Sequence, residues 1–291
     1  MDKNKFFAIV FWLGAFLIFY LLIGSPPGLK LTDVRADTAT TTVTITNATP
    51  TISSFLRGSV TLSEGVSVSA TSTGTASDNN GCSDIQSITA TFYDSSATSS
   101  SCGADNNNCY IASCATTTCS GTDSDFNCST TVQYFANNSS GWRWYATVTD
   151  AAPSSGTSTT ATTTIAQLNA LDVTNAIAYG SLALGGTSAT GATTTVTNTG
   201  NKNGMDAQVS AAAAMTCTSG TIAQANQHYA TTTSGFTYGS GVALSDTPTA
   251  ATLSIAQRTS ATTTGNIYWK LQAPATSTAG TCTGVNTFTA N

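Results

Sequence analysis

Eight cysteines give this 291-residue chain its clearest capacity for chemistry. Six lie in the first half of the sequence and two in the second, and even numbers on both sides are typical of disulfides closed within separate domains. The second pair allows only the bond Cys217–Cys282, whereas six cysteines allow 15 connectivities. We expect Cys82 to bond Cys128 at the base of a crosslinked segment, inside which the other four would pair: Cys102, Cys109, Cys114 and Cys119.

Metal binding is the alternative role for these thiols. The sequence contains no Cys-x-x-Cys pair and a single histidine, His228, so the spacing and ligands of a tetrahedral zinc site are missing. The same motif would be needed for a redox-active dithiol of the common kind. We therefore expect structural disulfides rather than a zinc or redox centre.

Calcium is a second metal to consider, because oxygen-bearing side chains alternate at Asp123, Asp125 and Asn127. An EF-hand would also need a glycine at the sixth position and an acid at the twelfth, which here is Tyr134. The three residues remain calcium candidates outside that motif, and a second group comprises Asp78, Asn79, Asn80 and Asp84. Asp and Asn are also ordinary turn residues whose side chains cap the local backbone, and this role is the simpler explanation of both groups.

Side chains used in catalysis are scarce in this chain. His228 is its only histidine, Glu64 is its only glutamate, and no Gly-x-Ser-x-Gly motif occurs. Hydrolysis of a glycoside would require two acids facing each other across a cleft, and most of the aspartates lie in turn-like segments. We expect no enzymatic activity and no cofactor other than calcium.

The charge of the chain excludes another class of function. Nine Lys and Arg stand against fourteen Asp and Glu, for a net charge of −5. Nucleic-acid-binding proteins carry a basic patch that neutralises phosphates, and so acidic a chain has no such footprint. We expect no nucleic-acid partner.

Residues 6–23 form an unbroken apolar block preceded by Lys3 and Lys5. As a helix this block would rise about 27 Å, close to the thickness of a bilayer core. The preceding lysines favour a cytoplasmic N-terminus, with the rest of the chain outside. Residues 1–36 are therefore expected to be either a signal peptide cleaved after Ala36 or an uncleaved membrane anchor, and the protein to be extracellular or displayed at the cell surface.

The remainder is predicted to be all-β, because alternating apolar and polar residues recur between turn signals. A Thr-rich lead-in at 37–49 is followed by a first domain at 50–166 and a second at 167–291. In the first domain, strands are expected at 59–72, 85–93, 132–135, 141–150 and 154–165. Residues 94–128, with five of the cysteines, are expected to be a long crosslinked loop.

The strand at 141–150 carries two tryptophans on one face. Trp142, Trp144, Ala146 and Val148 alternate with polar or amphipathic residues, and only a period of two places them together. We expect this face to pack in a core; the alternative is an exposed aromatic platform that stacks on sugar rings.

Two stretches resemble known families of surface domains. The sequence GWRWYATVTDAAPSSGT at 141–157 resembles the closing strands of PKD-like and bacterial Ig-like modules. Residues 177–182, Gly185-Gly186 and 193–201 resemble the opening of choice-of-anchor and NEW3-type Ig-like domains, and the segments at 267–274 and 279–284 resemble the last hairpin of related surface domains, where Cys282 replaces a residue such as Tyr. These resemblances imply two Ig-like β-sandwiches in series and carry no catalytic residue.

We therefore expect an exported cell-surface protein with a structural or adhesive role. Its partner would be a cell-surface protein, a glycan or another copy of the chain, and residues 94–128 would face that partner. If the N-terminal helix is not cleaved, it would anchor the chain in the membrane. A carbohydrate-binding module is one alternative, and exposure of Trp142, Trp144 or Trp269 would favour it. A subunit of a surface layer or filament is the other, and an unpaired strand at 39–47 would favour that.

Overall fold

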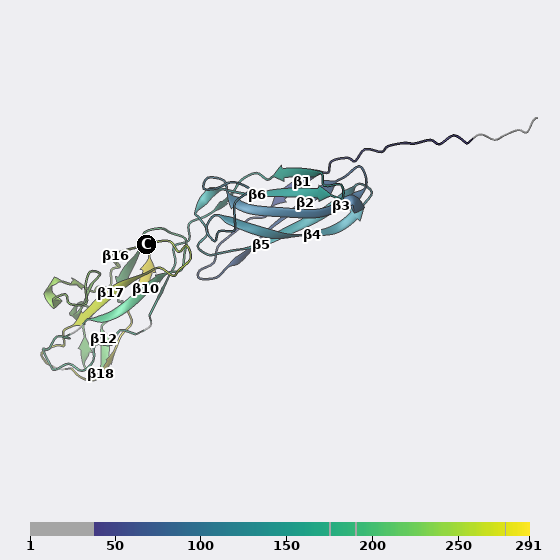
Figure 1. The fold of residues 1–291 in the computed structure, drawn as a ribbon. Helices are drawn as coiled ribbons and strands as arrows, with labels where there is room; N and C mark the ends of the chain where they lie inside the picture. Colours follow the sequence, from purple (N-terminus) through teal and green to yellow (C-terminus); the bar gives the residue numbers. More distant parts are fainter. Residues whose placement is uncertain (1–37, 175, 190, 277) are drawn as a thin grey trace, which may run out of the picture. The chain divides into compact units, whose positions relative to one another are not determined.

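The computed structural model describes residues 38–174, 176–189, 191–276 and 278–291 (Figure 1). The predicted apolar helix at 6–23 and the cleavage position after Ala36 lie outside these residues. Within the described ranges, none of the helices is long and apolar enough to cross a membrane. The stretch from Asn47 to Asn291 forms one compact unit, and residues 38–46 precede it as an exposed segment without strand structure.

The fold is all-β and sandwich-like, as predicted. The first half of the compact unit has eight strands and one 3-10 helix. These are β1 (Thr51–Arg57), β2 (Val68–Ser77), η1 (Cys82–Asp84), β3 (Ile85–Asp94), β4 (Cys109–Ser120), β5 (Asp123–Val132), β6 (Ser139–Asp150), β7 (Ser155–Thr159) and β8 (Thr163–Ile165).

The strands of this half are hydrogen-bonded in the order β1-β2-β5-β4-β3-β6-β7, with β8 also paired to β6, and each pair is antiparallel. Strand β4 belongs to both layers of the sandwich. Its first residues pair with β3, as in Tyr110 opposite Phe92, and its later residues pair with β5, as in Cys114 opposite Cys128. The chain thus turns from one layer to the other within a single strand, which brings β1 and β7 close together as well.

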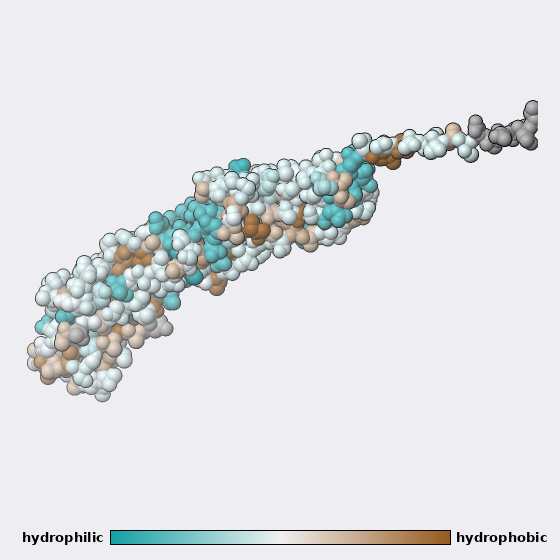
Figure 2. All heavy atoms as spheres, in the orientation of Figure 1, coloured by the Kyte–Doolittle hydropathy of each residue, from teal (hydrophilic) through white to brown (hydrophobic). Residues whose placement is uncertain are grey.

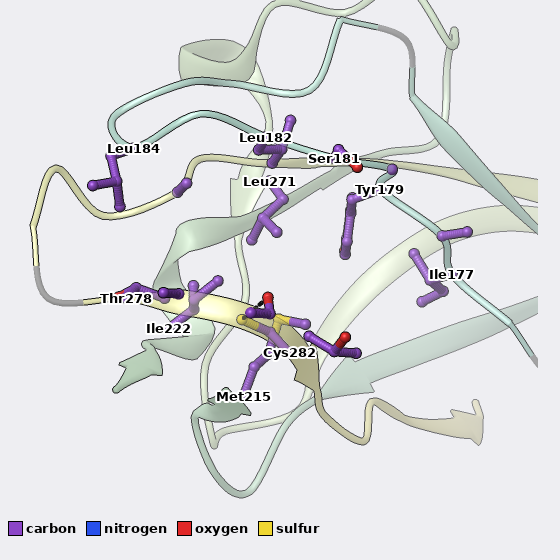
Figure 3. A pocket seen from close by; sticks show the side chains of 16 residues that line it. Ile177, Tyr179, Ser181, Leu182, Leu184, Met215, Ile222, Leu271, Thr278 and Cys282 are labelled. Atoms are coloured by element: carbon purple, nitrogen blue, oxygen red, sulfur yellow. Dashed lines mark hydrogen bonds between the residues drawn. The ribbon is translucent and has the colours of Figure 1, made fainter. Parts of the chain in front are cut away.

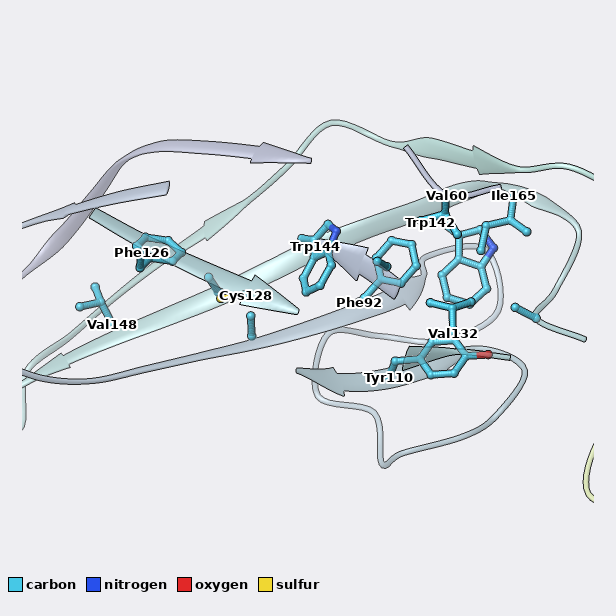
Figure 4. Close-up of a cluster of buried hydrophobic side chains, with 14 of the residues drawn as sticks. Val60, Phe92, Tyr110, Phe126, Cys128, Val132, Trp142, Trp144, Val148 and Ile165 are labelled. Carbon is cyan, nitrogen blue, oxygen red and sulfur yellow. The ribbon is translucent and has the colours of Figure 1, made fainter. Parts of the chain in front are cut away.

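The core between the layers contains the predicted tryptophan face. Trp142, Trp144, Ala146 and Val148 of β6 are fully buried. Figure 4 shows the two indole rings beside Phe92, whose ring centroid lies 4.8 Å from that of Trp142 and 5.0 Å from that of Trp144. Burying aromatic rings of this size contributes several kcal/mol, so this cluster is a main source of the stability of the first sandwich.

The prediction of a long loop at residues 94–128 is wrong. Strand β4 and most of β5 lie inside it and form a central hairpin of the sheet, which leaves residues 95–108 as the irregular part. The expected strand at 132–135 is also wrong, since β5 ends at Val132 and a turn follows. The strand expected at 154–165 is divided into β7 and β8, because residues 160–162 leave the extended ladder.

The second half of the compact unit contains three smaller sheets. Their orders are β15-β14-β17-β10-β9, β16-β11-β19 and β13-β12-β18, and all pairs are antiparallel. The strands are β9 (Leu171–Val173), β10 (Ala192–Asn198), β11 (Met205–Ser210), β12 (Met215–Ser219), β13 (Thr221–Ile222), β14 (Gln227–Ala230), β15 (Val242–Ala243), β16 (Thr249–Ile255), β17 (Thr264–Leu271), β18 (Ala279–Thr283) and β19 (Thr287–Ala290). The short helices are η2 (Gln224–Asn226) and η3 (Tyr238–Ser240).

The core of this second half forms around Trp269 of β17. Its ring is fully buried, lies 5.5 Å from Tyr229 between centroids, and donates a 3.0 Å hydrogen bond from Nε1 to Thr194 Oγ1. The two halves therefore have separate apolar clusters, each with a buried tryptophan. The surface in Figure 2 is mostly of intermediate hydropathy, with small, separated apolar patches, as the abundance of Ser and Thr leads one to expect.

Candidate functional site

All eight cysteines are paired in four disulfides: Cys82–Cys119, Cys102–Cys109, Cys114–Cys128 and Cys217–Cys282. The predicted Cys217–Cys282 bond is present, between residues directly opposite each other on β12 and β18. The predicted Cys82–Cys128 bond is wrong. Because β4 and β5 form a hairpin, Cys128 faces Cys114 across the ladder, and Cys82 in η1 reaches Cys119 near the end of β4.

The calcium candidates Asp123, Asp125 and Asn127 lie on one exposed face of β5. The Asp123 carboxylate accepts a 2.6 Å hydrogen bond from Ser77 Oγ. The Asp125 carboxylate accepts bonds of 2.8 Å from Thr75 Oγ1 and 2.9 Å from Thr118 Oγ1, and these bonds lower the pKa of Asp125. Hydroxyl groups of the neighbouring strands thus already bind these carboxylates, on a flat sheet face rather than in a loop that could surround an ion.

The second acidic group is brought together differently. Asp78 and Asp84 lie beside Asp150, and one carboxylate oxygen from each residue falls within 4.8 Å of the others. Sequence reasoning had named Asp78 and Asp84 but not Asp150, which lies 66 positions beyond Asp84 along the chain. The sequence feature that could have identified Asp150 is the Val-Thr-Asp end of the tryptophan strand, since this aspartate stands where that strand is expected to end.

The tryptophans do not form a sugar-binding platform. Trp142, Trp144 and Trp269 are fully buried, so none of the three presents a ring face to solvent. The observation that would have favoured a carbohydrate-binding module is therefore contradicted for these residues.

His228 is engaged in local packing. Its Nδ1 lies 2.7 Å from the carbonyl oxygen of Tyr238, and its ring stacks on the Tyr238 ring with centroids 4.0 Å apart. Within the described residues, no acid is hydrogen-bonded to this imidazole. The arrangement fits a histidine that fastens η3 to β14 rather than a general base.

An apolar groove crosses the second half of the compact unit, between residues 177–184 and β18 (Figure 3). It has a volume of about 550 Å³, and a neighbouring hollow of about 420 Å³ shares part of its lining. Figure 3 shows apolar side chains pointing into it from both sides; the main ones are Ile177, Tyr179, Leu182, Met215, Ile222 and Leu271. The Cys217–Cys282 disulfide fixes its floor.

Tyr179 brings a polar group to the boundary between this groove and the neighbouring hollow. The hydroxyl of Tyr179 donates a 2.9 Å hydrogen bond to Gln227 Oε1, and burial raises the pKa of Tyr179. Asn286 Nδ2 donates to the same oxygen at 3.0 Å. The groove can therefore accommodate an apolar chain segment while Tyr179 and Asn286 keep their hydrogen bonds to Gln227.

Side-chain hydrogen bonds link the first eight strands to the rest of the compact unit. Gln257 Nε2 donates to the Phe135 carbonyl at 2.7 Å, and Asn201 Nδ2 donates to the Ala136 carbonyl at 2.9 Å. Asn107 Nδ2 donates to the Arg258 carbonyl at 2.9 Å. The Arg258 guanidinium in turn packs over the Phe135 ring, 4.9 Å from its centroid.

No protein-family model matches the chain, and no curated protein is similar to it. The resemblance to PKD-like and NEW3-like modules therefore remains a prediction.

Proposed function

We propose that the chain is an exported cell-surface protein with a structural or adhesive role. The observation that carries this proposal is the pairing of all eight cysteines, in both halves of the compact unit. Disulfides form and persist in oxidising spaces outside the cytoplasm and are rare inside it. Two of the bonds, Cys114–Cys128 and Cys217–Cys282, join directly opposite residues on neighbouring strands and lock the register of those strands.

The way the chain is built supports a mechanical or display role. Both tryptophan-centred cores are buried, and the side-chain hydrogen bonds at Gln257, Asn201 and Asn107 connect one half to the other. The exposed faces consist largely of short hydroxyl side chains, which hydrate well and pair across strands. A protein built in this way can display a rigid, hydrated surface that contains few charged side chains.

The partner-facing element that we propose is narrower than the segment predicted from the sequence. Residues 95–108 remain irregular, and the Cys102–Cys109 bond ties them to the start of β4. Asp105 accepts backbone hydrogen bonds from Asn107 and Asn108, which fixes the turn. A loop held in this way presents a surface to a cell-surface protein or glycan with little loss of conformational entropy on binding.

Surface location can be tested on intact cells that make the protein. Antibodies raised against residues 38–291 should label unpermeabilised cells, and added protease should remove that signal while a cytoplasmic marker survives. Labelling that requires permeabilisation would contradict the proposal.

A second candidate function is self-assembly into a surface layer or filament. Val43 and Ile45, in the exposed Thr-rich segment, are each 82 % exposed and have no strand partner within the described ranges. The apolar groove of a second copy is a receptor of matching chemistry for such a segment. Light scattering on the chain and on a Val43→Asp/Ile45→Asp variant tests this: concentration-dependent assembly that the variant loses supports it, and a monomer at all concentrations contradicts it.

A further inference from the structure

Three carboxylates from separate elements converge at one end of the first sandwich. Asp78 directly follows β2, Asp84 ends η1 and Asp150 ends β6. Backbone hydrogen bonds hold them there: Asp78 N donates to the Thr122 carbonyl at 2.9 Å, and Ala151 N donates to the Asp84 carbonyl at 2.9 Å. One carboxylate oxygen of each residue lies within 4.8 Å of the others, so the fold itself, rather than side-chain flexibility, brings the three charges together.

The environment of these charges is poor in solvent and in cations. Asp78 is 1 % exposed and Asp150 is 3 % exposed, while Asp84 is half-buried. Among the described residues, no Lys, Arg or His forms an ion pair with any of the three. Like charges this close, with little water to screen them, repel one another strongly unless a proton or a cation lies between them.

Within the described residues, three of the six carboxylate oxygens of this cluster accept hydrogen bonds. Asp150 Oδ1 accepts from the backbone N–H groups of Ala152 and Ser154, and Oδ2 accepts from Asn47 Nδ2 at 2.7 Å. Asp78 Oδ1 accepts from Asn80 N at 2.8 Å. Asp78 Oδ2, by contrast, is buried without any hydrogen-bond partner. A buried anionic oxygen without a partner is costly, and its carboxylate belongs to the acidic cluster.

We propose that Asp78, Asp84 and Asp150 form a divalent-cation site that takes calcium. The donors are all oxygens, which suit hard cations, and no thiol or imidazole is available there for zinc. Calcium binds oxygens at about 2.4 Å, so two ligands on opposite sides of one ion lie about 4.8 Å apart. Three oxygens inside that limit can share one ion, and water can complete its six to eight ligands.

The position of the site gives the cation a structural consequence. Asp150 also holds Asn47, the first residue of the compact unit, and Asn80 Oδ1 accepts a 2.7 Å bond from Ala48 N. Neutralising the three acids would stabilise the turn after β2, η1 and the end of β6 together with this entry point. Calcium would thus fasten Asn47 and Ala48 at the start of the compact unit.

Calcium titration of the full chain, stripped with EDTA and dialysed, tests the proposal. We expect saturable binding by calorimetry and a rise in melting temperature with CaCl2 at pH 7. The most informative variant is Asp84→Asn, because within the described residues its carboxylate accepts no hydrogen bond and the change is nearly isosteric. This variant should melt above the unmodified chain in EDTA, since one repelling charge is gone, and should bind calcium at least about tenfold more weakly.

The matched control is Asp125→Asn, which removes a carboxylate from the exposed face of β5 and should leave calcium affinity unchanged. Asp78→Asn, checked for folding by circular dichroism, should likewise lose binding. No calcium-dependent shift in the unmodified chain, or an equal shift in Asp84→Asn, would overturn the proposal.

Discussion

Cys114 and Cys128 lie directly opposite each other on the neighbouring strands β4 and β5, and a disulfide joins them across the ladder. The bond closes only 14 residues of chain, and Cys128 is completely buried. Its main effect is therefore to fix the register of the central hairpin, because so short a loop restricts the conformations of the unfolded chain only modestly. The Cys217–Cys282 bond also joins opposite residues but spans 65 positions, so it restricts the unfolded chain much more.

This difference in loop length predicts an order of stability losses. In the chain-entropy model, removing Cys217–Cys282 costs about 4 kcal/mol, and removing Cys102–Cys109, which spans 7 positions, costs about 2 kcal/mol. Urea unfolding of the two double-alanine variants measures both free energies. Equal losses, or the reverse order, would show that strain or local packing dominates over loop closure.

Truncating the aromatic core should be more costly than reshaping it. Trp144→Ala removes a fully buried indole that lies against Phe92, and we expect a loss of about 3–5 kcal/mol in the free energy of unfolding. Trp144→Phe keeps an apolar ring and should cost less. Denaturant unfolding of both variants checks the order, and a loss below about 1 kcal/mol for Trp144→Ala would contradict the burial of this ring in the core.

Two glycines provide a test of the close approach between β7 and the start of β1. A Cβ added at Gly156 would fall on the backbone carbonyl of Pro50, whereas a Cβ at Gly103 would meet nothing within 4 Å. Gly156→Ala should therefore destabilise the chain by about 1–3 kcal/mol through overpacking. Gly103→Ala should change the free energy of unfolding by less than about 0.5 kcal/mol. Thermal unfolding of the pair tests this, and similar stabilities would mean that the two segments are not in contact.

Asp150 predicts a pH dependence at acid pH. The hydrogen bond from Asn47, followed by those from Ser154 and Ala152, lowers its pKa below the ordinary value of 3.8. A lowered folded-state pKa means that the contribution of Asp150 to stability is complete above the unfolded pKa and is lost as the pH falls through the folded pKa. In EDTA, Asn47→Ala should raise the pKa of Asp150 and leave that of Asp125 unchanged, as followed by NMR titration of the side-chain carboxyls. An unchanged Asp150 would contradict the bond to Asn47.

The strands that were predicted correctly are those with a strong contrast between their faces. Trp142, Trp144, Ala146 and Val148 are buried and alternate with half-buried residues along β6. β3 likewise begins at Ile85 as expected. In both cases the apolar residues are large enough that only one face can be buried.

The hairpin of β4 and β5 was missed because its residues are short and polar. Ser124, Phe126 and Cys128 are buried and alternate with exposed Asp123, Asp125 and Asn127, so a period of two was present. Cysteine, Asp and Asn are also typical of crosslinked turns, so the composition predicts a loop where the structure has two strands. The wrong Cys82–Cys128 pairing followed from it, because the partner of Cys128 depends on the register of strands that had not been recognised.

The acidic site could be anticipated only in part. Asp78 and Asp84 are close in sequence, but Asp150 joins them through the antiparallel pairing of β3 with β6, in which Ile85 lies opposite Asp150. A sequence pattern within one segment does not report such a long-range contact. The burial of all three described tryptophans was equally decisive, because it removed the sugar platform as a function.

The intact mass of the native protein, taken from the cells that make it and trapped with a thiol-alkylating reagent, tests the central claim most directly. If the chain works in an oxidising space outside the cytoplasm, no cysteine is alkylated before reduction. Subsequent reduction then adds about 8 Da, two hydrogens for each of the four disulfides. Alkylated cysteines before reduction, with a correspondingly smaller gain, would contradict both the pairing of all eight cysteines and the proposed location at the cell surface.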